Sequence, residues 1–176
     1  SGYKSASFKT LVGLPFAENF NSGSLPEGWK APSGKLIGDS VTFSGSGAWT
    51  FGSSNGVFDS HARANVYSNY QKWLILPEIL IPTMEEGDLG YQMTFSLALT
   101  KFSGTLTPVT AGSQADDRFI VLASLDGGAN WNILQEWNNT GSEFVYDNIA
   151  CSAEGEEVTV DISAYAGQSI QLAFYG

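Results

Sequence analysis

The stretch from Arg118 to Trp137 reads RFIVLASLDGGANWNILQEW, and it carries the strongest structural signal in the chain. Two runs rich in apolar residues flank the turn DGGAN at positions 126–130, and Trp131 opens the second run. Glycine, aspartate and asparagine adopt the positive-φ conformations that a tight hairpin needs. The stretch therefore predicts an antiparallel β-hairpin within an all-β domain.

Composition limits the classes of partner that this protein can have. The chain has 176 residues, of which 43% are hydrophobic, so it is long enough to bury a core of its own. Eight basic residues against eighteen acidic ones give a net charge of −10, which repels phosphate backbones and anionic membranes. We expect no nucleic-acid partner, and no segment has the apolar length that membrane insertion requires.

Polar but uncharged residues are abundant, and charged residues make up only 15% of the chain. Such a surface is typical of secreted β proteins. Cys151 is the single cysteine, so the chain has no internal disulfide, and for a secreted protein this favours a bacterial source. We therefore expect an extracellular or bacterial cell-surface location.

Apolar residues alternate with polar ones at a period of two along much of the chain, and helical periodicity is almost absent. Residues 91–100 show this most clearly, with Tyr91, Met93, Phe95, Leu97 and Leu99 on one face. The same alternation recurs over residues 157–162 and 170–175. Each of these segments predicts a strand with one buried and one solvated side.

Two further runs are apolar on both faces. Residues 119–125 predict a central strand, and residues 73–81 predict either one kinked strand or two strands that meet at Pro77. Many short strands separated by glycine, serine and asparagine clusters indicate an antiparallel β-sandwich. We expect residues 1–176 to form a single sandwich domain that lacks its final C-terminal strand or strands, since the last predicted strand reaches Gly176.

Several segments, taken in order, resemble one group of known modules. They are FAENF at 16–20 with LPEGW at 25–29, WLILP at 73–77, DRFIVLASLDGGANW at 117–131 and VDISAYAGQSIQLAF at 160–174. Together they resemble the cleaved-adhesin and choice-of-anchor modules of Bacteroidetes surface proteins, and more distantly the MAM domain. The resemblance implies a jelly-roll sandwich related to galactose-binding-like domains, a non-catalytic role on secreted or surface proteins, and in many members a structural calcium ion.

Glu18 and Asn19 are candidate calcium ligands. If Phe16 and Phe20 face the core from one strand, Glu18 shares their face, and a buried carboxylate needs a partner or a metal. Ca²⁺ binds several oxygen ligands, so Asn19 and a distant acid could complete its shell. The alternative is a bulge that turns Glu18 towards water.

Asp116 and Asp117 precede the predicted central strand. Paired acids at the entry to a strand could coordinate the same calcium ion, or they could form a solvated turn. The resemblance leaves this set incomplete, because related modules end on an Asp-Asp pair that this chain does not reach.

A second set of residues is a candidate ligand-binding patch. Asp59, His61 and Arg63 lie on one face if their segment is extended, and this face is either a polar binding patch or the solvated side of a strand. Trp137 and Asn138 end a predicted strand at a loop, where the indole could stack on a sugar or could be buried.

The predicted function is non-enzymatic binding to glycans or to host or matrix proteins, by a monomer or by one part of a larger multidomain chain. No nucleophile elbow, phosphate-binding loop or metalloprotease motif is present. The first alternative is a structural accessory domain packed against a neighbouring peptidase or anchoring domain. A hydrolase on the same fold is the second.

Overall fold

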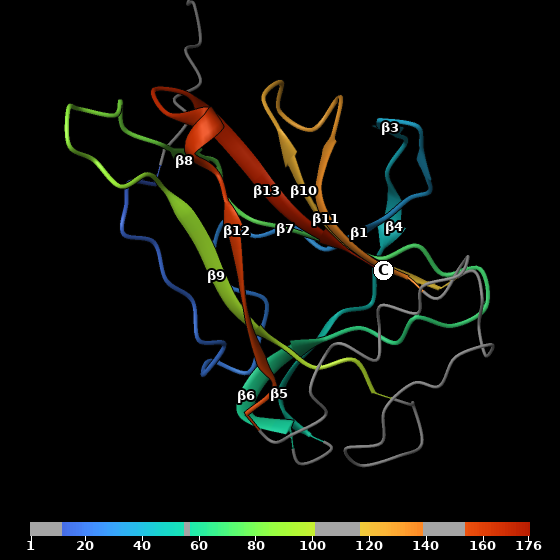
Figure 1. Ribbon diagram of the computed structural model, residues 1–176. Coiled ribbons are helices and arrows are strands. Elements are labelled where there is room, and N and C mark those ends of the chain that lie inside the picture. The colour runs from blue at the N-terminus through green and yellow to red at the C-terminus, as the bar shows by residue number, and fades with distance from the viewer. Residues whose placement is uncertain (1–11, 55–56, 101–116, 139–153) are drawn as a thin grey trace, which may run out of the picture.

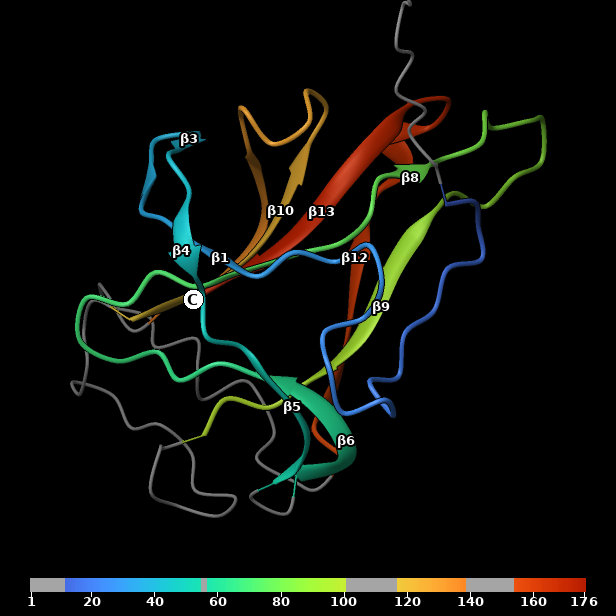
Figure 2. The same ribbon diagram turned by 180° about the vertical axis from the view of Figure 1, so that it is seen from behind.

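The computed structural model describes residues 12–54, 57–100, 117–138 and 154–176, and the statements below concern these residues. They form the predicted antiparallel β-sandwich, with one short 3₁₀ turn (Figures 1 and 2). None of the described helical segments is long and apolar enough to cross a membrane. The elements in chain order are β1 (Pro32–Ser33), β2 (Leu36–Ile37), β3 (Ser40–Val41), β4 (Ser44–Ser46), β5 (Thr50–Ser54), β6 (Val57–Arg63), β7 (Trp73–Ile75), β8 (Ile79–Leu80), β9 (Gln92–Leu97), β10 (Arg118–Ser124), β11 (Asn132–Asn138), β12 (Glu156–Asp161), η2 (Ser163–Tyr165) and β13 (Ser169–Tyr175).

A five-stranded sheet forms the centre of the molecule. Its strands follow the order β11-β10-β13-β7, and β8 also pairs with β13. The predicted hairpin is confirmed as β10–β11, and the predicted central strand is confirmed as β10, which has neighbours on both sides. The alternation predicted a solvated face for residues 170–175, and this is wrong. Gln171, Ala173 and Tyr175 are buried, because β13 lies inside the sheet and is covered on both faces.

The run at residues 73–81 forms two strands, β7 and β8, so the second of the two interpretations is correct. Pro77 lies between them and has no N–H to donate to a neighbouring strand. Pairing with β13 resumes on both sides of this break, since the amides of Leu76 and Ile81 donate to Leu172 and Gln168, each at 2.9 Å.

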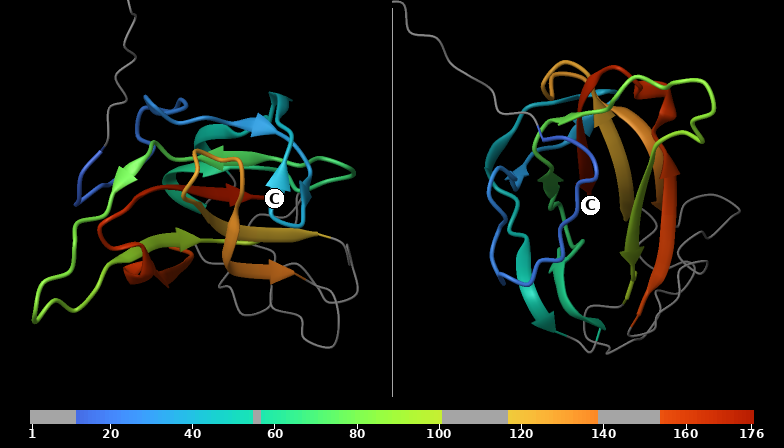
Figure 3. Two further views of the ribbon diagram at one scale, coloured as in Figure 1. Left: turned by 90° about the horizontal axis from the view of Figure 1, so that it is seen from above. Right: turned by 90° about the vertical axis from the view of Figure 1, so that its left-hand side faces the viewer.

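The first face of the central sheet packs against a layer made of two separate strand pairs, β9–β12 and β5–β6 (Figure 3). The alternation predicted for residues 91–100 is confirmed in β9, which turns Met93, Phe95 and Leu97 inwards. The buried side chains of the central sheet on this face are Leu74, Leu76, Phe119, Val121, Ala123 and Leu172.

The second face is covered by the segment that contains β2 and β3 and by an aromatic cluster. Trp73 is completely buried, with its ring centroid 5.1 Å from that of Trp131 and 4.9 Å from that of Tyr175. Its indole N–H donates to the Gly34 carbonyl oxygen at 2.7 Å. Trp131, which is 2% exposed, is therefore a core residue.

Asp126 holds the turn of the β10–β11 hairpin. Its Oδ1 accepts hydrogen bonds from two backbone amides of the turn at 3.0 and 2.9 Å, and its Oδ2 accepts one from Asn130 Nδ2 at 2.6 Å. Gly127 and Gly128 have φ values of 75° and 93°, which L side chains rarely adopt. Hydrogen bonds from Asn130, and then from the Ser124 hydroxyl, lower the pKa of Asp126 to about 2.

Replacement of Asp126 by alanine removes these acceptors together, so D126A is expected to lower the melting temperature. Because the folded-state pKa is depressed, the carboxylate stabilises the fold above its ordinary pKa of 3.8, and this contribution is lost as the pH falls towards 2. The difference in melting temperature between wild type and D126A should shrink between about pH 5 and about pH 2 in calorimetric scans. A constant difference over this range would contradict the role assigned to the carboxylate.

Candidate functional site

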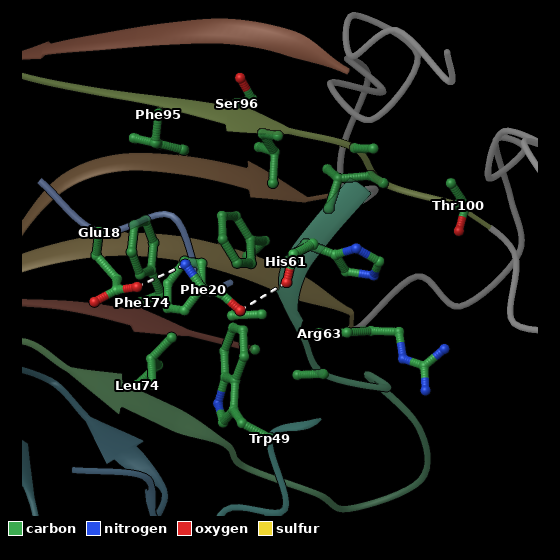
Figure 4. Close-up of a pocket in the computed structure, with 18 of the residues that line it drawn as sticks. Glu18, Phe20, Trp49, His61, Arg63, Leu74, Phe95, Ser96, Thr100 and Phe174 are labelled. Carbon is green, nitrogen blue, oxygen red and sulfur yellow. Dashed lines mark hydrogen bonds between the residues drawn. The ribbon is translucent and has the colours of Figure 1, made fainter. Parts of the chain in front are cut away.

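A cavity opens between β6 and β9, on the first face of the central sheet (Figure 4). Its volume is about 450 Å³, which is within the range of ligand pockets. Residues 60–64 form one wall and residues 94–100 form the opposite wall. The cavity therefore lies where the two strand pairs of the second layer remain separate.

The interior of the cavity is apolar, and much of it is aromatic. Phe174 lies 5.1 Å from Phe95 and 5.9 Å from Phe119, measured between ring centroids. Phe20 and Trp49 line the same space, and Trp49 Nε1 is buried without a hydrogen-bond partner among the described residues. The polar side chains that line it include Glu18, Asn19, Ser60, His61, Arg63 and Thr100.

Glu18 lies at one end of this cavity (Figure 4). The strand that was one of the two possibilities for residues 16–20 does not form, because the backbone there is irregular and Phe20 has φ 56°. The predicted alternation of burial is nevertheless correct, since Phe16, Glu18 and Phe20 are half-buried while Ala17 and Asn19 are exposed. Glu18 Oε1 accepts the amide of Phe20 at 2.6 Å, which stabilises this irregular turn.

His61 and Arg63 line the cavity from β6, so the structure brings them together with Glu18 and Asn19. Burial, and then the charge of Arg63, lower the pKa of His61, which favours the neutral imidazole. Arg63 is exposed, and its Nε donates to Thr50 Oγ1 at 3.4 Å. Asp59 belongs to the same extended strand but is exposed and lies outside the cavity lining.

Trp137 does not provide an exposed ring, so the second of the two interpretations of this indole, burial, is correct. It is only 6% exposed, because its ring packs 5.8 Å from Phe119 and 6.4 Å from Phe95. Asn138 Nδ2 donates to Glu136 Oε1 at 2.9 Å. Both carboxylate oxygens of Glu136 also accept hydrogen bonds from the Arg118 guanidinium. The Arg118 guanidinium and Asn138 hold the pKa of Glu136 below its usual range.

The proposed calcium ligands are only partly brought together. Asp117 is half-buried at the start of β10 and is not among the residues lining the cavity, and Asp116 lies outside the described residues. Within the described ranges, no group of three or more histidine, cysteine, aspartate or glutamate side chains is placed to hold a metal ion. Glu18 and Asn19 thus supply only part of a calcium shell, which requires about six to eight oxygens.

The walls of the cavity could not be identified from the sequence. The alternation of β9 predicts that Phe95 and Leu97 face inwards. Inward-facing side chains normally pack against a covering layer, so this pattern does not predict a cavity. The opening depends on where β6 lies relative to β9, and no local pattern encodes that distance.

Comparison with known proteins supports the fold. No protein-family model matches the chain, and no curated protein matches it. Among solved structures, it is similar to the K1 cleaved adhesin domain of Lys-gingipain (Kgp) from Porphyromonas gingivalis W83, with a TM-score of 0.51. The two share 17% sequence identity over 90% of this chain and 85% of that chain. This similarity shows a distant adhesin-like fold.

Ser60 connects β6 to the Glu18 end of the cavity, because its Oγ donates to the Phe20 carbonyl oxygen at 2.6 Å. S60A is therefore expected to destabilise the protein by about 1 kcal/mol in urea denaturation, and to speed amide exchange in residues 16–20. S44A, on exposed β4, is the control and should stay within about 0.5 kcal/mol of wild type. Equal effects of the two substitutions would contradict this connection.

Proposed function

We propose that this protein is a non-catalytic, adhesin-like binding module that acts outside the cell and binds host or matrix proteins through the cavity between β6 and β9. The observation that carries the proposal is the cavity itself. It is an opening of about 450 Å³ into the core, lined by aromatic rings and edged by polar side chains. The adhesin-like fold supports the same class of function.

The chemistry of the cavity favours a polypeptide ligand. Apolar side chains of a partner gain free energy by leaving water for the space beside Phe95, Phe119 and Phe174. The hydroxyl groups of a sugar would lose hydrogen bonds to water there, at a cost of about 1–3 kcal/mol for each unpaired group. Polar side chains such as Thr100 and Arg63 can bind the backbone of a polypeptide at the edge of the opening.

The lining lacks the groups that a hydrolase needs, as far as the described residues extend. Glycoside hydrolysis commonly uses two carboxylates, and Glu18 is the single acidic residue in the described lining. Ser60 is not arranged as a nucleophile, because its hydroxyl donates to the Phe20 carbonyl oxygen and not to a general base. These observations support the non-catalytic proposal over the hydrolase alternative.

A bulky side chain at the mouth of the cavity should block the ligand. Ala64 lines the cavity just after β6, so A64W is expected to lower binding to surfaces coated with laminin, fibronectin or collagen by about tenfold or more, measured by biolayer interferometry. The matched control is A164W, which adds the same indole on the exposed turn η2. Melting curves should show that both variants remain folded.

Two outcomes would contradict the proposal. Equal binding by A64W and A164W would place the ligand elsewhere. Absence of binding by the wild-type protein to all three coated surfaces would favour the accessory-domain alternative, in which a neighbouring domain of the same protein covers the opening.

We also propose a structural calcium ion, with ligands from Glu18, Asn19, Asp116 and Asp117. The proposal rests on oxygen chemistry at one end of the cavity. Glu18 Oε1 and Asn19 Oδ1 each accept one backbone amide, at 2.6 and 3.0 Å, and a carboxylate or amide oxygen has a second lone pair for a cation.

Calcium that binds only the folded state must stabilise it. Added Ca²⁺ is expected to raise the free energy of unfolding by about 2.7 kcal/mol at 100 times its Kd, and a chelator should reverse the effect. The measurement is the melting temperature of the wild type and of the double variant D116N/D117N, which should lose the dependence on calcium. An unchanged melting temperature of the wild type with chelator and with excess Ca²⁺ would remove the calcium proposal.

A further inference from the structure

The loop between β6 and β7 exposes two tyrosine rings to water. Tyr67 is 64% exposed and Tyr70 is 58% exposed. Their neighbours Ser68, Asn69 and Gln71 are polar. The loop extends from the body at the right of Figure 1 and at the left of Figure 2. Single exposed apolar residues are common on any protein surface and need no explanation. A pair of exposed aromatic rings on one loop is unusual and is therefore a candidate binding surface.

A tight turn sets the positions of the two rings. The amide of Tyr70 donates to the carbonyl oxygen of Tyr67 at 3.2 Å, and Ser68 adopts φ 58°, a left-handed conformation that is uncommon for serine. The turn places the ring centroids 6.4 Å apart, with an angle of 39° between the ring planes. A left-handed conformation of a residue other than glycine costs free energy, and the surrounding structure has to maintain it. Such conformations cluster at functional sites.

The end of the loop that leads into β7 is anchored to the body of the protein. The Gln71 carbonyl oxygen accepts hydrogen bonds from the Gly34 amide at 3.1 Å and from Ser33 Oγ at 2.8 Å. Lys72 exchanges two backbone hydrogen bonds with Gly176, at 2.7 and 3.0 Å. The tyrosine pair therefore stands on a rigid base.

Lys72 also supports the Tyr70 ring directly. Its side chain is buried, with 7% of the residue exposed, and its Nζ lies 4.9 Å from the ring centroid. Such a cation–π contact favours one orientation of the ring. Because the ammonium group occupies one face of the ring, a ligand that stacks on Tyr70 uses the opposite face.

We propose that Tyr67 and Tyr70 form a second binding site, which stacks pyranose units of a neutral glycan. A pyranose has a face of C–H groups that packs on an aromatic ring, and an edge of hydroxyl groups that requires hydrogen-bond partners. The rings provide the first requirement. The tyrosine hydroxyls, with the exposed side chains of Ser68 and Asn69, provide the second. Tyrosine also loses little conformational entropy on binding, because it has two side-chain torsions.

The size of the patch favours a glycan over a protein at this site. A stable protein interface buries about 800 Å² on each partner and has an apolar centre. Here two rings stand among polar residues, and the other large exposed apolar side chains of the described residues belong to different segments, such as Ile37, Leu89 and Leu125.

The tyrosine site is separate from the cavity. Ala64 and Val66 line the cavity, whereas Tyr67 and Tyr70 are not part of its lining. The inference therefore goes beyond the proposed protein-binding function and does not depend on it.

The test uses the full chain and a panel of neutral oligosaccharides built from glucose, mannose, galactose or xylose, with affinities from isothermal titration calorimetry. At least one oligosaccharide should bind, and Y67A or Y70A should weaken that binding by about tenfold. Y67F and Y70F retain the rings and should keep most of the affinity. L89A, which truncates an exposed residue elsewhere, should bind as the wild type does.

Three results would overturn the inference. The first is that no oligosaccharide of the panel binds, and the second is that the wild type and the double variant Y67A/Y70A bind equally well. The third is that this double variant loses its binding to matrix proteins but keeps its binding to glycans. A64W separates the two sites. It should keep the glycan affinity of the wild type, and the tyrosine variants should keep the affinity for matrix proteins.

Discussion

Burial of both faces of the central sheet is the constraint on which the rest of this structure depends. Ile120 and Val121 are neighbours on β10 and point to opposite faces, yet each is completely buried. Leu172 and Ala173 on β13 likewise point to opposite faces, and they are 2% and 0% exposed. A sheet with two apolar faces requires cover on both, so the chain has to supply two further layers from its remaining segments.

The two layers cover the sheet unequally. On the second face, Trp73, Trp131 and Tyr175 fill the space with contacting aromatic rings, and the Trp73 N–H is satisfied by Gly34. On the first face, the cover consists of two strand pairs, β5–β6 and β9–β12, that do not join. The cavity is the direct consequence of this division, and its aromatic interior is the part of the core that the two pairs leave accessible.

The loop between β6 and β7 links the two proposed sites. Ala64 and Val66, near its start, line the cavity, and the chain then turns at residues 67–70 so that Tyr67 and Tyr70 project into water. The loop then rejoins the sheet through Lys72 and Gly176. The two proposed sites together would suit a glycosylated protein, whose polypeptide would enter the apolar opening and whose sugar would stack on the tyrosine rings.

Local patterns in the sequence predicted the strands β7 to β13, which sides of β9 and β12 face inwards, and where the hairpin turns, because the period of two and the turn chemistry of residues 126–130 act over a few residues. They also marked Glu18, His61 and Arg63 as candidates. Only the tertiary structure decided that these three share one cavity, since they come from segments about 40 residues apart that meet on the central sheet. It also buried Trp137 beside Phe95 and Phe119, and it held Tyr67 and Tyr70 in water through contacts of the loop with Gly34 and Gly176. Exposure of an aromatic ring is decided by its distant neighbours, and packing on the sheet sets where those neighbours lie.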